Sequence, residues 1–224
     1  MTEPPQEEGA QTFEELGLSK EVLTALSEMG WESPTPVQRD SYPLAIAGHD
    51  IIVQSRTGTG KTGAFGIPLV DKLITEDGDE QALILAPTRE LALQSAAEIA
   101  KLGAHRNIDT VAVYGGASME RQVHALEKGA RVISGTPGRV LDHLKRGTMN
   151  ASKLRFLVLD EADEMLSMGF AKELHAIIER LPKKRQTLLF SATVDRAIKR
   201  VAEKHMHDPQ FLGLSGDHVG ALGI

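Results

Sequence analysis

Residues 55–62 read Ser55-Arg56-Thr57-Gly58-Thr59-Gly60-Lys61-Thr62, a pattern suited to holding phosphate. Glycines let backbone N–H groups approach phosphate oxygens, and the helix expected to follow presents its positive end. Lys61 can then reach the β- and γ-phosphates, and the Thr62 hydroxyl can bind Mg²⁺. Ser55 stands where the usual pattern begins with glycine, and a small residue can fill that place. The alternative is a glycine-rich turn without chemical meaning.

A second candidate is the acidic run Asp160-Glu161-Ala162-Asp163, which follows the apolar segment 156–159. Taken alone, the run fits better as the start of a helix, where negative side chains are favoured. Beside a phosphate loop, however, a carboxylate at a strand end is placed for Mg²⁺. We therefore assign Asp160 to the metal and Glu161 to orienting and deprotonating an attacking water.

Three more polar segments follow apolar runs: Pro87-Thr88-Arg89-Glu90-Leu91-Ala92, Gly115-Gly116 and Thr136-Pro137-Gly138-Arg139. Arginines, glycines, threonine hydroxyls and helix N-termini can hold a sugar–phosphate backbone without reading its sequence. Such residues are also ordinary in turns between strands and helices. We find no aromatic residue between these segments, so base stacking is not indicated.

The segment 31–38 offers groups for a purine base. The Gln38 amide carries a donor and an acceptor that match the N6 and N7 edge of adenine. Phe13 and Trp31 can cover the faces of the ring, or both can be core residues. In Ser191-Ala192-Thr193, the hydroxyls can reach the acidic run or can cap a helix, and in isolation the cap is favoured.

Alternating elements must position these residues. Short apolar runs predict strands at 50–54, 82–86, 110–114, 131–134, 156–159, 187–190 and 211–214. Amphipathic runs predict helices at 63–74, 89–102, 119–127, 138–146, 171–180 and 194–205. This alternation is typical of a mainly parallel sheet with helices on both faces. In such a fold, ligands bind outside the carboxyl ends of the strands, so every candidate loop is expected on one rim.

Composition limits the class of protein. The net charge of −6 argues against a large basic nucleic-acid surface, although a local one remains compatible with it. The chain has no cysteine, no signal peptide and no run of 18 apolar residues, so we expect a soluble cytoplasmic protein without membrane contact. Residues 1–11 predict a disordered lead, 12–214 one domain, and 215–224 the start of a linker.

Taken in order, these motifs resemble the DEAD-box family of ATP-dependent RNA helicases. The resemblance rests on Gln38, the loop ending at Thr62, the three polar segments, the literal Asp-Glu-Ala-Asp, and Ser191-Ala192-Thr193. It implies a RecA-like P-loop domain in which Phe13, Trp31, Gln38 and residues 55–62 bind ATP or ADP. It further implies that Lys61, Asp160 and Glu161 act in hydrolysis with Mg²⁺ held by Thr62 and Asp160, and that Asp163, Ser191 and Thr193 couple hydrolysis to strand separation.

The resemblance also implies one RNA strand held by Pro87, Thr88, Arg89, Gly115, Gly116, Thr136, Pro137, Gly138 and Arg139. Family members carry a second RecA-like domain with arginine fingers, and this sequence stops before one. We therefore expect nucleotide binding with little hydrolysis and no unwinding by the chain alone. The alternatives are a DNA translocase of the same architecture and a non-catalytic binding module.

Overall fold

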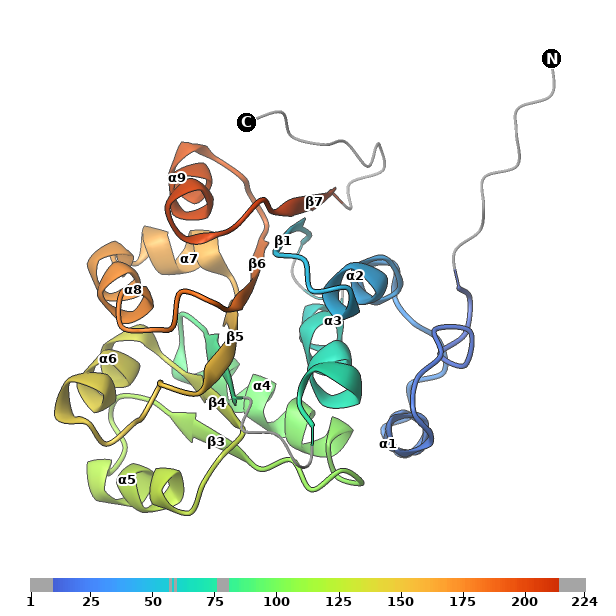
Figure 1. The fold of residues 1–224 in the computed structure, drawn as a ribbon, viewed down its shortest axis with the longest axis horizontal. Coiled ribbons are helices and arrows are strands. Elements are labelled where there is room, and N and C mark those ends of the chain that lie inside the picture. Colours follow the sequence, from blue (N-terminus) through green and yellow to red (C-terminus); the bar gives the residue numbers. More distant parts are fainter. Residues whose placement is uncertain (1–9, 57, 59, 76–80, 214–224) are drawn as a thin grey trace.

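The computed structural model describes residues 10–56, 58, 60–75 and 81–213. Thr57 and Thr59 of the predicted phosphate loop, the predicted lead up to residue 9, and the predicted linker lie outside these residues. Figure 1 shows a central sheet with helices packed on both of its faces. None of the described helices is long and apolar enough to cross a membrane.

Seven parallel strands form the sheet in the order β3-β4-β2-β5-β6-β1-β7. Their bounds are β1 Ile51–Gln54, β2 Gln81–Leu85, β3 Thr110–Val113, β4 Val132–Gly135, β5 Leu154–Leu159, β6 Gln186–Ser191 and β7 Gln210–Gly213. Each predicted strand is present within two residues of its expected limits. The prediction of a parallel α/β sheet is thus confirmed.

Two layers of helices cover the sheet (Figure 1). One layer contains α1 Lys20–Glu28, α2 Pro36–Ile46, α3 Lys61–Pro68, the π-helical turn η1 Leu69–Leu73, and α4 Arg89–Leu102. The other contains α5 Met119–Glu127, α6 Pro137–Arg146, α7 Ala162–Ser167, α8 Ala171–Ile178 and α9 Arg196–His205. Covering both faces explains why the strands are apolar at successive positions.

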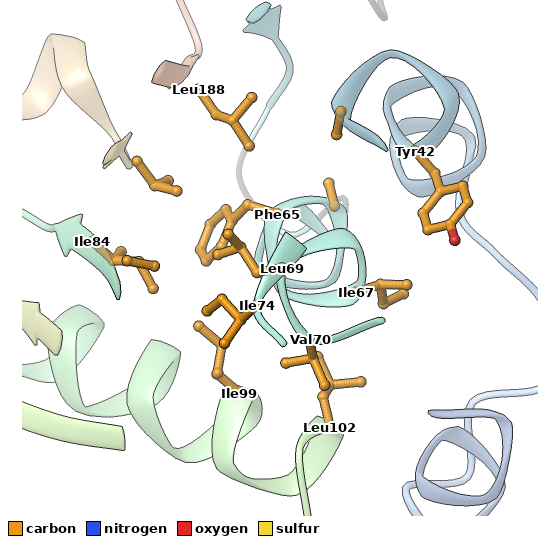
Figure 2. Packing of buried hydrophobic residues seen from close by; sticks show 14 of the residues in the cluster. Tyr42, Phe65, Ile67, Leu69, Val70, Ile74, Ile84, Ile99, Leu102 and Leu188 are labelled. Carbon is orange, nitrogen blue, oxygen red and sulfur yellow. The ribbon is translucent and has the colours of Figure 1, made fainter. Parts of the chain in front are cut away.

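Two hydrophobic clusters, one under each helical layer, hold the sandwich together. Val53 of β1 points into the first cluster and its neighbour Ile52 into the second, as the alternation of a strand requires. In the first cluster, Phe65 of α3 packs edge-to-face against Phe190 of β6 with ring centroids 5.4 Å apart. Figure 2 shows Ile99 and Leu102 of α4 close to the residues of α3 and η1. The packing therefore fixes the helix that follows the phosphate loop.

Some predicted helices differ from the structure in their extent, and one helix was missed. The expected helix 63–74 ends at Pro68 and continues as the π-helical turn, because proline has no N–H to donate to the preceding turn. The short helix α7 was not predicted. Helix α9 is capped by Asp195, whose carboxylate accepts hydrogen bonds from the N–H groups of Ala197 and Ile198. The interpretation of Ser191 and Thr193 as helix caps is therefore wrong.

A buried carboxylate in the π-helical turn ties three helices together. Asp71 is 3% exposed, accepts a 2.6 Å hydrogen bond from the Tyr42 hydroxyl of α2, and accepts a 2.7 Å bond from the N–H of Ser19, the N-cap of α1. Burial and this hydrogen bond raise the pKa of Tyr42, so the phenol stays a donor. The first two helices are thereby anchored to the helix that begins at Lys61.

Candidate functional site

A cavity of about 270 Å³ lies at the carboxyl ends of the strands, where the sequence predicts a ligand. It is lined by residues of the segment between α1 and α2, the loop after β1 with the start of α3, the segment after β5, and the helix α4. These are Trp31, Gly58, Gly60, Lys61, Thr62, Leu91, Gln94, Glu98, Asp160 and Glu161. The cavity therefore brings together the phosphate loop and the first two residues of the acidic run. Lys61 and Glu161, which both line it, are 100 positions apart in the chain.

The described part of the phosphate loop has the backbone that the glycines were expected to allow. Gly58 and Gly60 have φ values of 81° and 82°, which is the left-handed region that disfavours other residues. A Cβ at Gly60 would also lie 2.8 Å from the Gln38 amide nitrogen. Ser55 is buried, and its N–H donates a 3.0 Å hydrogen bond to the carbonyl of Ser191. Ser55 thus joins the base of the loop to the end of β6, while Arg56 is exposed.

Lys61 and Glu161 form an ion pair in this cavity. The Lys61 Nζ and Glu161 Oε1 atoms are 3.4 Å apart, and the side chains are 6% and 16% exposed. Glu161 has a φ of 51°, a conformation that costs a residue with a side chain roughly 1 kcal/mol or more. The strained backbone turns the chain directly into α7. Glu161, the predicted general base, is thereby held against Lys61, the residue predicted to bind phosphate.

Asp160 is 5% exposed, and its Oδ1 atom has no hydrogen-bond partner within the described residues. Burial, together with the nearby Glu161 charge, raises the pKa of Asp160 to about 7, although Lys61 opposes both. A buried, unpartnered carboxylate oxygen beside the Thr62 hydroxyl is a donor set that fits a hard cation such as Mg²⁺. The residues present therefore fit the metal that the sequence predicts.

Gln38 is held in one orientation beside the cavity. Its Oε1 accepts a 3.1 Å hydrogen bond from the N–H of Thr35, and its Nε2 donates a 3.2 Å bond to the carbonyl of Gly60. Because each amide atom can form two hydrogen bonds, one acceptor and one donor remain. Gly63 is required here, since an added Cβ would lie 2.7 Å from the Trp31 ring and would overlap the Gln38 amide.

The two aromatic candidates lie in different places. Trp31 lines the 270 Å³ cavity and a neighbouring one of about 430 Å³, whereas Phe13 lines only the latter. Phe13 is 3% exposed and packs in the first hydrophobic cluster. The structure therefore brings Trp31 to Lys61 and does not bring Phe13 there.

The end of the acidic run contacts the segment after β6. The Oδ2 atom of Asp163 accepts hydrogen bonds from the N–H and the hydroxyl of Thr193, both 3.2 Å long. The Ser191 hydroxyl donates instead to the carbonyl of Thr193 at 2.6 Å. Of the two hydroxyls, only that of Thr193 reaches the acidic run directly, while Ser191 fixes the shape of its own loop.

The three polar loops meet beside the edge strand β3. The Arg89 guanidinium lies 4.8 Å from the ring centre of Tyr114, which directly precedes Gly115. Arg139 donates a 3.0 Å hydrogen bond to the carbonyl of Ala117, just after Gly116. The expectation that no aromatic residue accompanies these segments is wrong, because Tyr114 links two of them. A cavity of about 560 Å³ opens there, lined among others by Arg89, Tyr114 and Gly116.

The remaining residues of the polar loops shape this surface. Thr88 caps α4 by accepting a hydrogen bond from the N–H of Leu91, and Pro87 is buried. Thr136 precedes α6, which begins at Pro137, and Gly138 is exposed in its first turn. Two helix N-termini therefore begin within the segments predicted to hold a phosphate backbone.

Sequence reasoning missed the contribution of α4 to the first cavity. Leu91, Gln94 and Glu98 line it, and their spacing of three and four residues places them on one face of the helix. That helical spacing, starting inside a motif already singled out, is the signal that could have found them.

Comparison with known proteins gives the family. Residues 35–201 match the model of the DEAD/DEAH box helicase family. The chain is 50% identical over 213 residues to the DEAD-box ATP-dependent RNA helicase CshA of Geobacillus kaustophilus, covering 95% of this chain and 46% of that protein. It is 44% identical over 212 residues to the ATP-dependent RNA helicase CshA of Listeria monocytogenes, covering 95% of this chain and 41% of that protein.

A solved structure agrees in fold. The DEAD box protein from the hyperthermophile Methanococcus jannaschii superimposes with a TM-score of 0.87 at 44% identity, covering 92% of this chain and 56% of that one. The chain thus spans about half the length of the curated relatives it matches. Because the family model matches residues 35–201, which is most of the chain, this chain belongs to the DEAD/DEAH box helicase family.

Proposed function

We propose that this chain is the ATP-binding first domain of an ATP-dependent RNA helicase, as the names of its relatives suggest. The observation that carries the proposal is the convergence of Lys61, Glu161 and Asp160 on one cavity after the phosphate loop. In this proposal the cavity takes ATP or ADP, and the surface around Arg89, Tyr114 and Arg139 takes one RNA strand.

Nucleotide binding rearranges the ion pair. The phosphates attract Lys61, which moves from Glu161 toward them, and the freed Glu161 carboxylate orients and deprotonates the attacking water. Backbone N–H groups of residues 55–62, including those of Gly58 and Gly60, hold the phosphate oxygens at the start of α3. Asp160 and Thr62 would hold Mg²⁺, which would supply positive charge to neutralise the negative charge of the phosphates.

Gln38 selects adenine because its amide cannot rotate. The bonds to Thr35 and Gly60 direct the remaining acceptor and donor of the amide in a fixed sense. Adenine presents a donor at N6 and an acceptor at N7, whereas guanine presents acceptors at both O6 and N7. Guanine would therefore set one acceptor against another. Trp31 covers one face of the base, and Phe13 supports this region from the core.

Coupling to the RNA strand uses the second acidic contact. The hydrogen bonds between Asp163 and Thr193 join the end of the acidic run to the loop after β6. The hydrogen bond from the Ser191 hydroxyl to the Thr193 carbonyl holds the shape of that loop. In the longer protein, a second RecA-like domain supplies arginine fingers, which can be worth ~10³–10⁵ in rate. The chain alone is therefore expected to bind nucleotide, to hydrolyse it slowly and to leave RNA duplexes intact.

The substitution Glu161→Gln tests this proposal in a protein that carries the second domain. ATP hydrolysis and displacement of an RNA strand should both stop while ATP binding persists, because the amide cannot accept the proton of water. Glu164→Gln, an exposed neighbour in α7, is the matched control and should change neither. Turnover retained by Glu161→Gln would remove this residue as the base. Displacement of DNA duplexes in preference to RNA would favour a DNA translocase.

A further inference from the structure

Two buried polar side chains, Gln122 of α5 and His143 of α6, are hydrogen-bonded to each other, and Gln122 lies between the Gly115-Gly116 loop and the first turn of α6 (Figure 1 shows both helices). Gln122 is 6% exposed and His143 is fully buried. Neither takes part in the nucleotide site or belongs to the motifs that predict RNA binding. Burying an amide and an imidazole is costly unless their hydrogen bonds are satisfied, so their partners indicate what they do.

The Gln122 amide joins the backbone before Gly115 to the first turn of α6. Its Nε2 donates a 2.9 Å hydrogen bond to the carbonyl of Tyr114, and its Oε1 accepts a 3.2 Å bond from Nη1 of Arg139. A carbonyl can only accept and a guanidinium can only donate, so the two ends of the amide cannot be exchanged. Arg139 and Tyr114 therefore define the orientation of Gln122.

That orientation determines the protonation of His143. Its Nε2 lies 2.9 Å from the Oε1 atom of Gln122, which has no proton to give, so Nε2 must carry the hydrogen. Burial lowers the pKa of His143, and the neighbouring Arg139 lowers it further. The neutral ring then leaves Nδ1 as an acceptor 2.8 Å from the Thr148 hydroxyl, whose single proton goes to Nδ1 rather than to the His143 carbonyl, 3.2 Å away. A single tautomer thus satisfies the pair.

The backbone on both sides of the glycine pair is held by this network. Gln122 binds the carbonyl of Tyr114, which precedes Gly115, and Arg139 binds the carbonyl of Ala117, which follows Gly116. Both bonds of Arg139 come from Nη1, so its Nε and Nη2 donors make no hydrogen bond within the described residues. Three N–H donors of a side chain fixed in place are therefore left for a ligand.

We propose that Gln122 and His143 are positioning residues for RNA binding, which fix Arg139 and the Gly115-Gly116 loop in the arrangement that receives the phosphate backbone. The inference rests on the proposed RNA-binding function. It assigns contact with phosphate to Arg139 and to the backbone, and it assigns no ligand contact to Gln122 or His143. Without the network, ordering the Arg139 side chain would oppose binding, because a long side chain loses rotamer freedom when it is fixed.

The experiment compares binding of a fluorescein-labelled single-stranded oligouridine to the chain and to three variants at several salt concentrations. His143→Leu and Gln122→Met remove the hydrogen bonds and keep an apolar side chain of similar size. Each is expected to weaken RNA binding about tenfold and to lower the slope of log affinity against log salt by about 0.7, the effect of one lost phosphate contact. His143→Gln restores a donor toward Gln122 and should recover most of the affinity and the slope.

Adenine nucleotide affinity is measured on the same samples and should be unchanged, which shows that each variant is folded. Equal RNA affinity and equal salt slope in His143→Leu and in the unmodified chain would overturn the positioning role alone. If the unmodified chain, saturated with ATP·Mg²⁺, bound no RNA, both the positioning role and the proposed RNA site would fail.

A second measurement needs no RNA and no variant. Nitrogen-15 chemical shifts of the imidazole should show the neutral ring with its proton on Nε2 at pH 7. A ring protonated on Nδ1, or a charged ring, would contradict the network and overturn the proposal.

Discussion

At the scale of single residues, the nucleotide site is defined by groups that serve as each other's partners. Lys61 and Glu161 neutralise one another across 3.4 Å, so the cation expected to bind phosphate is already positioned and largely buried. The cost of keeping it buried is offset by the carboxylate. Phosphate can then replace Glu161 as the partner of Lys61, so the buried lysine stays paired when nucleotide binds.

Removing that cation should weaken nucleotide binding specifically. Lys61→Ala eliminates a charge-assisted contact to phosphate and leaves Glu161 as an uncompensated negative charge facing the ligand. We expect ADP affinity to fall by about 10- to 100-fold, corresponding to roughly 1.5–3 kcal/mol. Calorimetric titration with ADP and Mg²⁺ measures the change.

Lys199→Ala, which removes an exposed lysine of α9, is the control and should bind ADP like the unmodified chain. Unchanged ADP affinity in Lys61→Ala would show that Lys61 does not contact the phosphates.

The residues that sequence reasoning found and missed differ in one physical respect. Lys61 and Asp160 could be predicted because their chemistry follows from residue type and from their place after a strand. Gln122 and His143 could not, because their importance comes from hydrogen bonds between atoms of separate helices. Tyr114 is different, because its place directly before Gly115 is visible in the sequence and was overlooked; only its contact with the Arg89 guanidinium needs the folded chain.

At the scale of elements, the π-helical turn helps to position the segment that we propose binds adenine. The helix α2 carries Gln38 near its start and Tyr42 one turn later, and Tyr42 donates to the buried Asp71. The turn that holds Asp71 follows Pro68, so a local interruption of the helix presents the carboxylate to α1 and α2. The interruption therefore contributes to the placement of Gln38.

Tyr42→Phe removes only the hydroxyl of this contact. The Asp71 carboxylate would lose a hydrogen bond inside the protein, and we expect the free energy of unfolding to fall by about 1–3 kcal/mol. Chemical denaturation gives this value directly. Tyr114→Phe is the matched control, because the Tyr114 hydroxyl makes no hydrogen bond within the described residues. It should change the free energy of unfolding by less than ~0.5 kcal/mol. Equal stability of Tyr42→Phe and the unmodified chain would show that the contact to Asp71 is not stabilising.

Element types could be predicted better than element ends. Strands covered on both faces have an unmistakable apolar pattern, and all seven were found. The end of α3 and the start of α9 were misplaced because hydrogen bonds decide them: Pro68 lacks a donor, and the Asp195 carboxylate accepts two. The short α7 follows Glu161, whose left-handed backbone has no sequence signal outside glycine and a few polar residues.

At the scale of the whole molecule, the two ends of the sheet differ in chemistry. The carboxyl ends carry the nucleotide cavity, whereas a cavity of about 400 Å³ at the other end is lined by Asp50, Arg185 and His205, among others. Burial, together with the neighbouring His175, Lys204 and Arg185, lowers the pKa of His205 to about 4, while Glu179 opposes them. The fold therefore keeps His205 neutral at pH values at which a histidine of the unfolded chain is protonated.

The sign of the effect follows from the two pKa values. In the unfolded chain a histidine has a pKa near ~6.5, so between that value and about 4 the unfolded state binds more protons at His205. The stabilisation from the neutral ring is present above pH ~6.5 and is lost as the pH falls toward about 4. His205→Gln should therefore lose less stability over this interval than the unmodified chain, as measured by urea denaturation at a series of pH values.

His124→Gln, which replaces an exposed histidine of α5, should leave the pH dependence of unfolding unchanged. The same pH dependence in His205→Gln and in the unmodified chain would show that His205 is not held neutral by the fold.

In the proposed function, this chain recognises adenine nucleotides through the phosphate loop and Gln38. The most direct test is a titration with ADP and with GDP carrying the same fluorophore on the ribose, in buffer with Mg²⁺. The structure predicts measurable ADP binding and GDP binding at least about tenfold weaker, because the fixed Gln38 amide opposes the guanine O6 acceptor. Equal affinity for both nucleotides would contradict adenine recognition by Gln38, and binding of neither would contradict the nucleotide site itself.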